Sequence, residues 1–195
     1  MNDKAILVHG YWISKGVSLL SERQADAAAR AYLAGEVDLI LCPTGYGEWG
    51  QGHIGEFIKK RILERYPEIS SAKIITFAGG AVNTKQELRI GLEFLRGKAF
   101  KRVLDLAPPF HNKRIKLIIF KIKNDFEIEF KTTFDYLRES ERMELLNSAL
   151  YKSCEKGEKF RLMIFQNRIL DFLADLMPDQ LKSMLEALSA KIAKF

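Results

Sequence analysis

The chain of 195 residues has a mass of 22.4 kDa, with 47% hydrophobic and 29% charged residues, which is the composition of an ordinary globular domain. Its apolar runs fall far short of the roughly 20 residues of a membrane span, and the first one is too short for the core of a signal peptide. We therefore expect a cytoplasmic protein without a membrane span, in which Cys42 and Cys154 are free thiols.

The net charge is +6 and the isoelectric point is near 9.2, which is compatible with nucleic acid or an acidic ligand as a partner. A local basic cluster consists of Lys113, Arg114, Lys116, Lys121 and Lys123. No nucleic-acid-binding motif accompanies it, so we interpret the cluster as solvated surface and expect no nucleic-acid partner. The three scattered histidines and two distant cysteines form no metal-ligand pattern, so we expect no metal site.

The predicted elements alternate between strand and helix. In chain order they are strand 5–10, helix 21–35, strand 37–42, helix 53–67, strand 72–78, helix 83–97, strand 101–107, helix 111–125 and strand 126–132. Ser21 and Asn83 are good residues to cap the start of a helix, and Gly35 and Gly97 are good residues to end one. The last strand alternates between apolar and polar residues, which favours a place at an edge of the sheet.

Segment 111–125 is the ambiguous one. Its β-forming residues stand in near alternation, which favours a strand, but a parallel strand after it needs a crossover, which favours a helix. We predict a helix there. Beyond residue 135 only helical patterns follow, at 136–152, 158–176 and 179–194. The broad apolar stripe of these helices either packs on the sheet domain or forms a homo-oligomer or partner surface.

The alternation predicts an α/β domain over residues 1–134, a three-layer Rossmann-like parallel sheet with helices on both faces. Residues 135–195 are predicted to be a helical C-terminal extension packed on it. Ligands of such sheets bind beyond the carboxyl ends of the strands, where the strand order reverses. Unusual residues follow these ends, namely Gly10, Gly45, Gly79, Gly80, Asn83, Thr84 and His111.

The stretch FAGGAVNTKQEL, residues 77–88, indicates an anion site. Gly79 and Gly80 let the backbone approach a ligand, and Asn83 and Thr84 stand at a helix N-terminus, where free N–H groups and the helix dipole favour negative charge. The alternative for Asn83 is a plain helix cap.

Two arginines could complete such a site, because the planar guanidinium group of Arg23 or Arg114 matches a phosphate or carboxylate. The alternative for Arg23 is an ion pair with Asp26.

The three histidines have different expected roles. His111 is either a general acid or anion ligand near Arg114, or it is a helix cap. His9, at the end of a buried strand, is more typical of a core histidine with satisfied hydrogen bonds, and His53 is expected to be exposed.

Residues 4–124 resemble the YdcF/SanA-type family of α/β domains. The resemblance is carried by Gly10, the segment SERQADAAARAYLAG, LILCPTG, VNTKQE and PPFHNKR, which stand in the order and spacing of that family. It implies ligand roles for Ser21 and Arg23 of the Ser-x-Arg motif, for Gly45, for Asn83 and Thr84, and for His111 and Arg114 of the His-x-x-Arg motif. Gln86 stands where the family commonly has a glutamate, and it cannot serve as an anionic ligand.

Three functions are compatible with these features. The first is a small-molecule site for a phosphorylated or nucleotide-like anion, with hydrolase or transferase activity and His111 as the catalytic residue. The second is a domain that senses such a ligand without catalysis, and the third is a protein-interaction domain that uses the C-terminal helices. No nucleotide-binding or hydrolase motif identifies the ligand or a cofactor.

Overall fold

The computed structural model describes residues 3–11, 18–45, 53–81, 83–122 and 124–166. Within these residues a parallel sheet of five strands has the order β3-β2-β1-β4-β5. The strands are β1 (Lys4–Val8), β2 (Leu39–Thr44), β3 (Ile74–Ala81), β4 (Arg102–Ala107) and β5 (Glu127–Thr132). The chain runs outward from β1 to β3, returns, and continues from β4 to β5. The strand order therefore reverses between β1 and β4.

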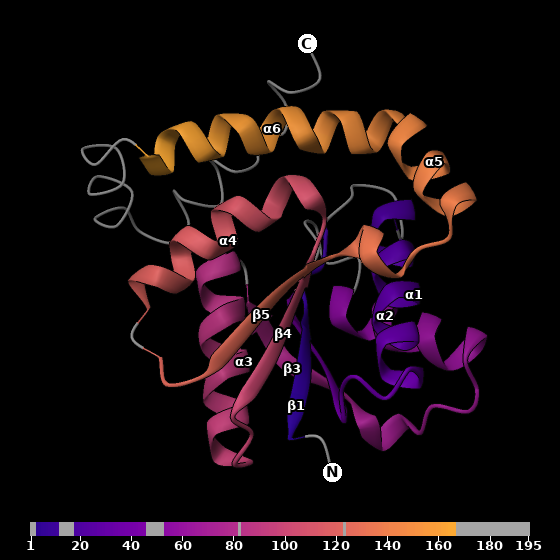
Figure 1. Cartoon of the computed structure of the whole chain (residues 1–195), viewed down its shortest axis with the longest axis vertical. Coiled ribbons are helices and arrows are strands. Elements are labelled where there is room, and N and C mark those ends of the chain that lie inside the picture. Colours follow the sequence, from indigo (N-terminus) through magenta and orange to yellow (C-terminus); the bar gives the residue numbers. More distant parts are fainter. Residues whose placement is uncertain (1–2, 12–17, 46–52, 82, 123, 167–195) are drawn as a thin grey trace.

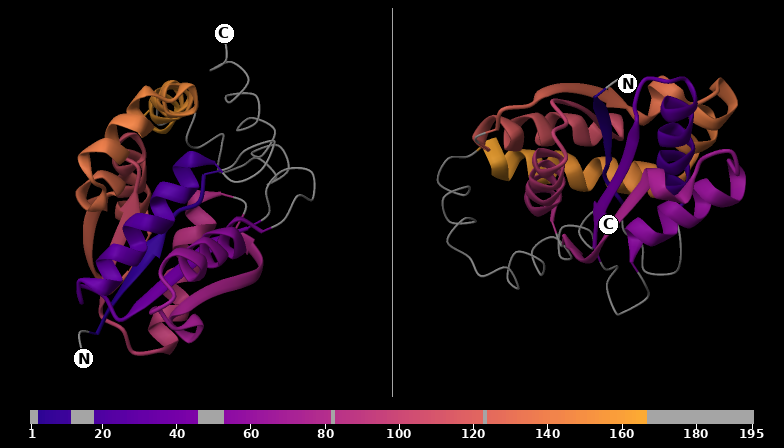
Figure 2. Two further views of the ribbon diagram at one scale, coloured as in Figure 1. Left: turned by 90° about the vertical axis from the view of Figure 1, so that its right-hand side faces the viewer. Right: turned by 90° about the horizontal axis from the view of Figure 1, so that it is seen from below.

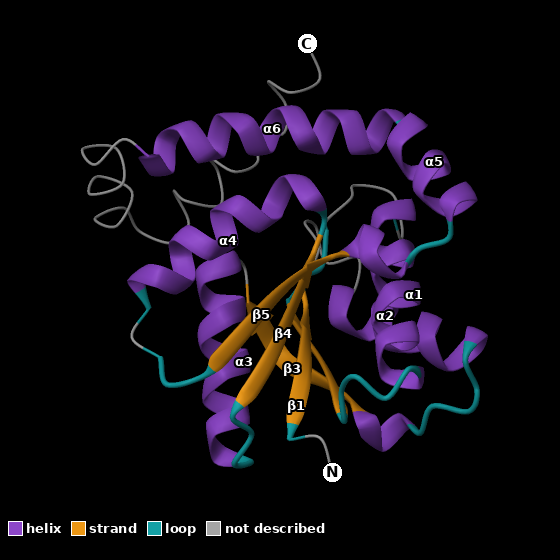
Figure 3. Cartoon of the chain, in the orientation of Figure 1, coloured by secondary structure: helices purple, strands orange, loops and turns teal. Residues whose placement is uncertain are grey.

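Helices cover both faces of this sheet, so the predicted three-layer α/β fold is confirmed (Figure 1). The helices are α1 (Leu19–Leu33), α2 (Ile54–Arg65), α3 (Thr84–Gly97), α4 (Pro109–Lys121), α5 (Glu139–Asn147) and α6 (Ala149–Gln166), with short 3-10 helices η2 (Ser71–Lys73) and η3 (Thr133–Tyr136). Seen from the side and from below, α1 and α2 lie on one side of the sheet and α3 and α4 on the other (Figure 2). Helix α6 crosses above the carboxyl ends of the strands, beside α4 (Figure 3).

The core has two halves because successive side chains of a strand point to opposite faces. In β1, Ile6 and Val8 pack with the side chains of α1 and α2, whereas Ala5 and Leu7 pack with those of α3 and α4. All four are fully buried, which explains why the sequence of β1 is continuously apolar rather than alternating. No helix among the described residues is long and apolar enough to cross a membrane.

Segment 111–125 follows the topological prediction, since α4 occupies Pro109–Lys121. Strand β5 pairs with β4 in parallel from Arg102↔Glu127 to Ala107↔Thr132, so the chain had to return along the sheet between the two strands. Strand β5 is at the edge, as predicted. Two β-branched residues of α4, Ile115 and Ile118, pack under the sheet, where burial outweighs their strand propensity.

Several expected boundaries are wrong. Ser18 caps α1, with its side chain accepting a hydrogen bond from the N–H of Ser21, so Ser21 lies inside the first turn. Gly35 does end its helix region, with φ +73°, but Gly97 is helical, and the left-handed residue after α3 is Ala99, with φ 58°. His53 is half-buried rather than exposed.

Beyond β5 the described residues are helical, but the helices differ from those expected. The predicted helix 136–152 is broken at Ser148, and α6 continues without the predicted interruption near residue 155. The predicted helix 179–194 and most of the apolar stripe of 158–176 lie outside the described residues. The division of the chain at residue 134 stays a prediction.

Gly10 and Gly97 should respond in opposite ways to alanine. A Cβ at Gly10 would stand 2.5 Å from Cγ2 of Ile54 and 2.7 Å from Cγ2 of Thr44, whereas a Cβ at Gly97 would meet nothing within 4 Å. We expect Gly10→Ala to cost about 1–3 kcal/mol through overpacking and Gly97→Ala to stabilise by about 0.4–1 kcal/mol. Urea unfolding of both variants measures the difference, and equal effects would contradict the close packing at Gly10.

Candidate functional site

The N-termini of α3 and α4 bring three of the predicted site residues together beside the end of β1. Thr84 is the first residue of α3, and His111 lies in the first turn of α4, whose preorganised start is Pro109. Oγ1 of Thr84 lies 3.4 Å from Nε2 of His111, and Nδ1 of His111 lies 3.1 Å from Nη2 of Arg114. These three side chains are buried, with Arg114 only 4% exposed.

Helix α6 adds a carboxylate that the sequence pattern did not single out. Glu158 is 1% exposed and forms an ion pair with Nε of Arg114, and its Oε1 lies 3.1 Å from Nδ1 of His111. Its Oε2 accepts a hydrogen bond of 3.1 Å from the hydroxyl of Tyr11 and lies 3.5 Å from Nη1 of Arg161. Burial alone would raise the pKa of Glu158, but Arg114 and His111 hold that pKa well below its usual value.

His111 is a neutral imidazole at neutral pH. Burial lowers its pKa to about 4, and the positive charge of Arg114 acts in the same direction, while Glu158 opposes both. The ring of Tyr11 contacts the ring of His111 edge-on, with centroids 5.2 Å apart. The pKa of the Tyr11 hydroxyl is raised well above its usual value by burial and by the nearby Glu158, so this hydroxyl keeps its proton and serves as a donor.

Ser21 reaches this group through the backbone of Tyr11. Its hydroxyl donates to the carbonyl oxygen of Tyr11 at 2.7 Å and accepts from the N–H of Tyr11 at 3.3 Å. The first turn of α1 therefore fixes the segment that carries the Tyr11 ring. Ser21 has a positioning contact here, and its predicted contact with a ligand stays a prediction.

A second buried group lies next to the first. Nδ1 of His9 lies 2.8 Å from Oε2 of Glu87, and Nε2 of His9 lies 2.9 Å from Oδ2 of Asp105. Burial would lower the pKa of His9, but Asp105 and Glu87 together outweigh it and raise that pKa to about 10. His9 is thus an imidazolium between two buried carboxyl groups, and the expectation of a satisfied core histidine is confirmed. Its ring centroid lies 5.9 Å from that of His111.

Glu87 and Asp105 come from neighbouring layers of the fold. Glu87 lies in the first turn of α3, where a negative charge is favoured, and Asp105 lies in β4. Burial raises the pKa of Glu87, but hydrogen bonds from His9 and Thr44 bring it below its usual value. Within the described part of the chain, Oδ1 of Asp105 is buried and accepts no hydrogen bond.

Gly10 is closely packed against Thr44 and Ile54, and contact of Gly10, Gly45, Gly79 or Gly80 with a ligand stays a prediction. Gly10 donates from its N–H to Oγ1 of Thr44 at 2.7 Å, and Gly45 donates to the carbonyl oxygen of Ala81 at 2.8 Å. Gly79 and Gly80 were expected to follow the third strand, but both belong to β3. The pairing of β2 with β3 shifts between Cys42↔Thr76 and Thr44↔Ala81, so these glycines lie in an irregular part of the strand, where glycine is common.

Asn83 caps α3, because its Oδ1 accepts a hydrogen bond of 3.0 Å from the N–H of Gln86. The cap is thus confirmed as one role of Asn83. Contact between Asn83 and a ligand stays a prediction.

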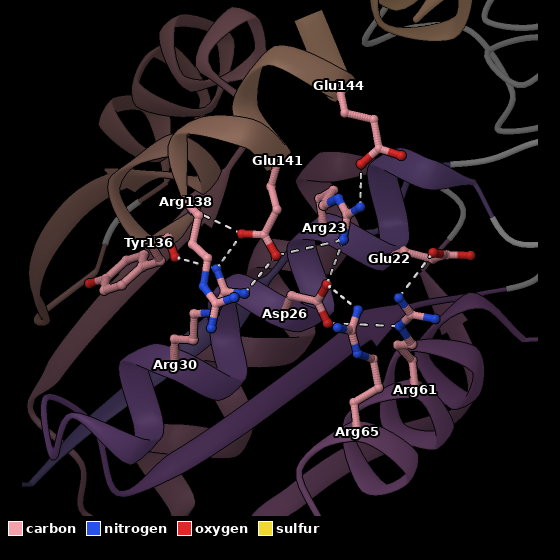
Figure 4. A network of polar contacts seen from close by, with 10 residues as sticks. All are labelled: Glu22, Arg23, Asp26, Arg30, Arg61, Arg65, Tyr136, Arg138, Glu141 and Glu144. Atoms are coloured by element: carbon pink, nitrogen blue, oxygen red, sulfur yellow. Dashed lines mark hydrogen bonds and ion pairs between the residues drawn. The ribbon is translucent and has the colours of Figure 1, made fainter.

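Arg23 contacts other residues than those of the His111 group. Its guanidinium lies 3.0 Å from Oδ2 of Asp26, as in the ion pair weighed from the sequence, and also pairs with Glu144 and, at 3.9 Å, with Glu141 of α5 (Figure 4). Asp26 is fully buried and is also approached by Arg61 and Arg65. The contacts of Arg23 therefore join α1 to α5, and those of Asp26 join α1 to α2.

A bidentate pair strengthens the same junction. Arg30 donates to both carboxylate oxygens of Glu141, at 2.6 and 2.7 Å, and to the carbonyl oxygen of Tyr136 (Figure 4). This contact is the main cause that lowers the pKa of Glu141 to about 2. Charged contacts therefore hold α5 on α1, and α5 leads directly into the helix that carries Glu158.

The residues that the sequence patterns missed are Tyr11, Glu87, Asp105 and Glu158. One signal was available for Asp105, because a carboxylate within the otherwise apolar β4 must find a buried partner. Glu158 stands seven residues after the buried Tyr151, on the same face of α6, which would have marked it as an inward-facing charge. Both signals indicate burial, but neither names the partner.

The described residues contain no group of histidine, cysteine and acidic side chains arranged to hold a metal ion. Comparisons of the chain with models of protein families, with curated proteins and with solved structures found no match.

Proposed function

We propose that this chain binds a small anionic molecule, phosphorylated or nucleotide-like, at the carboxyl edge of the sheet between β1 and β4. Thr84, His111 and Arg114 are its proposed contacts, and hydrolysis or group transfer with His111 as the acid–base residue is the proposed activity. The relation to the YdcF/SanA-type family belongs to the same proposal.

One observation carries the proposal. Thr84 lies in the first turn of α3, and His111 lies in the first turn of α4. Oγ1 of Thr84 lies 3.4 Å from Nε2 of His111, and Nδ1 of His111 lies 3.1 Å from Nη2 of Arg114. Helix N-termini favour anions, and the arginine supplies a full positive charge. Buried ionisable groups with strongly shifted pKa values, as for His9 and His111, are typical of functional sites in α/β proteins.

A sensing function without catalysis is the second candidate. It is favoured by the pKa of about 4 for His111, because an imidazole of such low basicity is a weak proton acceptor at neutral pH. Such a ring still serves as a hydrogen-bonding contact for a ligand.

The proposal is tested by a thermal-shift screen with nucleotides and sugar phosphates, each beside the counterpart that lacks its phosphate groups. We expect at least one anion to raise the melting temperature while its counterpart does not. In calorimetry, His111→Gln should weaken binding of that anion about 10-fold or more, at 1.4 kcal/mol per decade, and His53→Gln should leave it unchanged. A turnover assay with the bound anion then separates the enzyme from the sensor.

Two results would contradict a ligand site at His111. One is a screen in which no anion stabilises the chain. The other is an anion whose affinity is the same for the His111→Gln and His53→Gln variants.

A further inference from the structure

Glu158 receives the contacts that an anionic ligand of this site would need. Its two carboxylate oxygens face the guanidinium of Arg114, the ring of His111 and the hydroxyl of Tyr11, and Arg161 lies 3.5 Å away. Two guanidinium groups thus approach one carboxylate that is only 1% exposed. A phosphate dianion would match these two positive charges better than the single charge of a glutamate.

Helix α6 is held in place by contacts that do not involve Glu158. The ring of Tyr151 packs against Phe110 of α4, with centroids 4.9 Å apart, and stacks on Phe134 of η3 at 5.8 Å. Tyr151 is 5% exposed and belongs to the main core. These contacts of Tyr151 would keep α6 on the domain if the side chain of Glu158 left Arg114.

We propose that Glu158 is an internal ligand, a carboxylate from the C-terminal helix that occupies the anion site until a phosphate-bearing molecule displaces it. This inference rests on the proposed anion site and specifies how that site is regulated. Because Glu158 is favoured in its ionised form, it competes for Arg114 throughout the neutral pH range. Because of this competition, the apparent affinity for a ligand equals the intrinsic affinity multiplied by the fraction of molecules in which the site is open.

The test uses the full chain and inorganic phosphate at constant ionic strength, with chloride as the balancing ion. Glu158→Gln keeps the shape of the side chain and removes its charge. The matched control is Glu155→Gln on the same helix, because Glu155 is 41% exposed and pairs with Lys159 at 3.6 Å. We expect calorimetry to show phosphate binding to the Glu158→Gln variant about 10-fold tighter than to the wild type or the control.

The same variant should be less stable than the wild type, and phosphate should raise its melting temperature more than that of the Glu155→Gln variant. If Glu158→Gln does not fold even in phosphate, Glu158→Asp takes its place, since aspartate keeps the charge but withdraws it by one methylene. It too must bind phosphate more tightly than the wild type does.

The outcomes separate the two proposals. A nucleotide or sugar phosphate that binds the wild type and the Glu158→Gln variant equally overturns the internal ligand and leaves the anion site intact. If no anion binds any of these proteins, both proposals are wrong. If phosphate binds the Glu155→Gln and Glu158→Gln variants with equal gain over the wild type, the effect is a general one of charge and the internal ligand is overturned.

Discussion

Replacement of His9 by glutamine should destabilise the fold by about 3–5 kcal/mol, because it removes the positive charge between two buried carboxyl groups. Glu87 and Asp105 lie 2.8 and 2.9 Å from the imidazole nitrogens of His9, and His9 and Asp105 are fully buried. Glutamine can still donate a hydrogen bond, so the loss in free energy of unfolding would reflect mainly the missing positive charge. Urea unfolding at pH 7 gives the value, and His53→Gln is the control.

The pH dependence of this contribution has a definite sign. The pKa of His9 is raised in the folded protein from 6.5 to about 10, so its stabilising effect is fully present below pH 6.5 and is lost as the pH rises through about 10. We expect the free energy of unfolding of the wild type to fall over that range and the gap to the His9→Gln variant to narrow. A gap below about 1 kcal/mol at pH 7, or one that does not narrow toward pH 10, would show that His9 is neutral in the fold.

Replacement of Arg114 by methionine should cost about 3–5 kcal/mol, because it leaves the carboxylate of Glu158 buried without its main partner. An arginine exposed in an open cleft would cost little when removed, but Arg114 is 4% exposed. The double variant Arg114→Met with Glu158→Met should recover most of the loss, since apolar side chains of similar volume often replace a buried ion pair without net cost.

A double-mutant cycle by urea unfolding measures the coupling between Arg114 and Glu158, with Lys113→Met as a control at an exposed position of the same helix. We expect a coupling energy above about 1 kcal/mol for the buried pair. Additive effects of the two substitutions would show that Arg114 and Glu158 do not act as a pair in solution.

The fold was predictable from the sequence because local patterns and topology agree over most of the chain. Apolar runs predicted β1 to β4, and an alternating pattern predicted β5. For α4 the need for a crossover outweighed the strand propensity of residues such as Ile115 and Ile119. Boundaries failed where two residues of similar chemistry compete for one role. Ser18 and Ser21 are both good caps, and only the backbone geometry selects Ser18.

The candidate site was predictable only in the part that local sequence encodes. Thr84 and His111 stand in the first turns of α3 and α4, Arg114 follows His111 by three residues, and a parallel sheet brings such helix starts to one edge. Glu158 is 44 positions away from Arg114 along the chain, and its approach depends on how α6 crosses the sheet edge. No local pattern encodes that crossing, because it results from long-range packing of Tyr151 on Phe110.

The most direct test of an anion site at His111 is nuclear magnetic resonance of the imidazole nitrogens, since the chain has only three histidines, His9, His53 and His111. Before ligand is added, His9 should be an imidazolium at neutral pH and His111 a neutral ring. On titration with the anion that the thermal-shift screen identifies, the His111 nitrogens should shift and saturate at the calorimetric Kd, while those of His53 stay unchanged. Saturable binding of the anion with no change at His111 would contradict the proposed site.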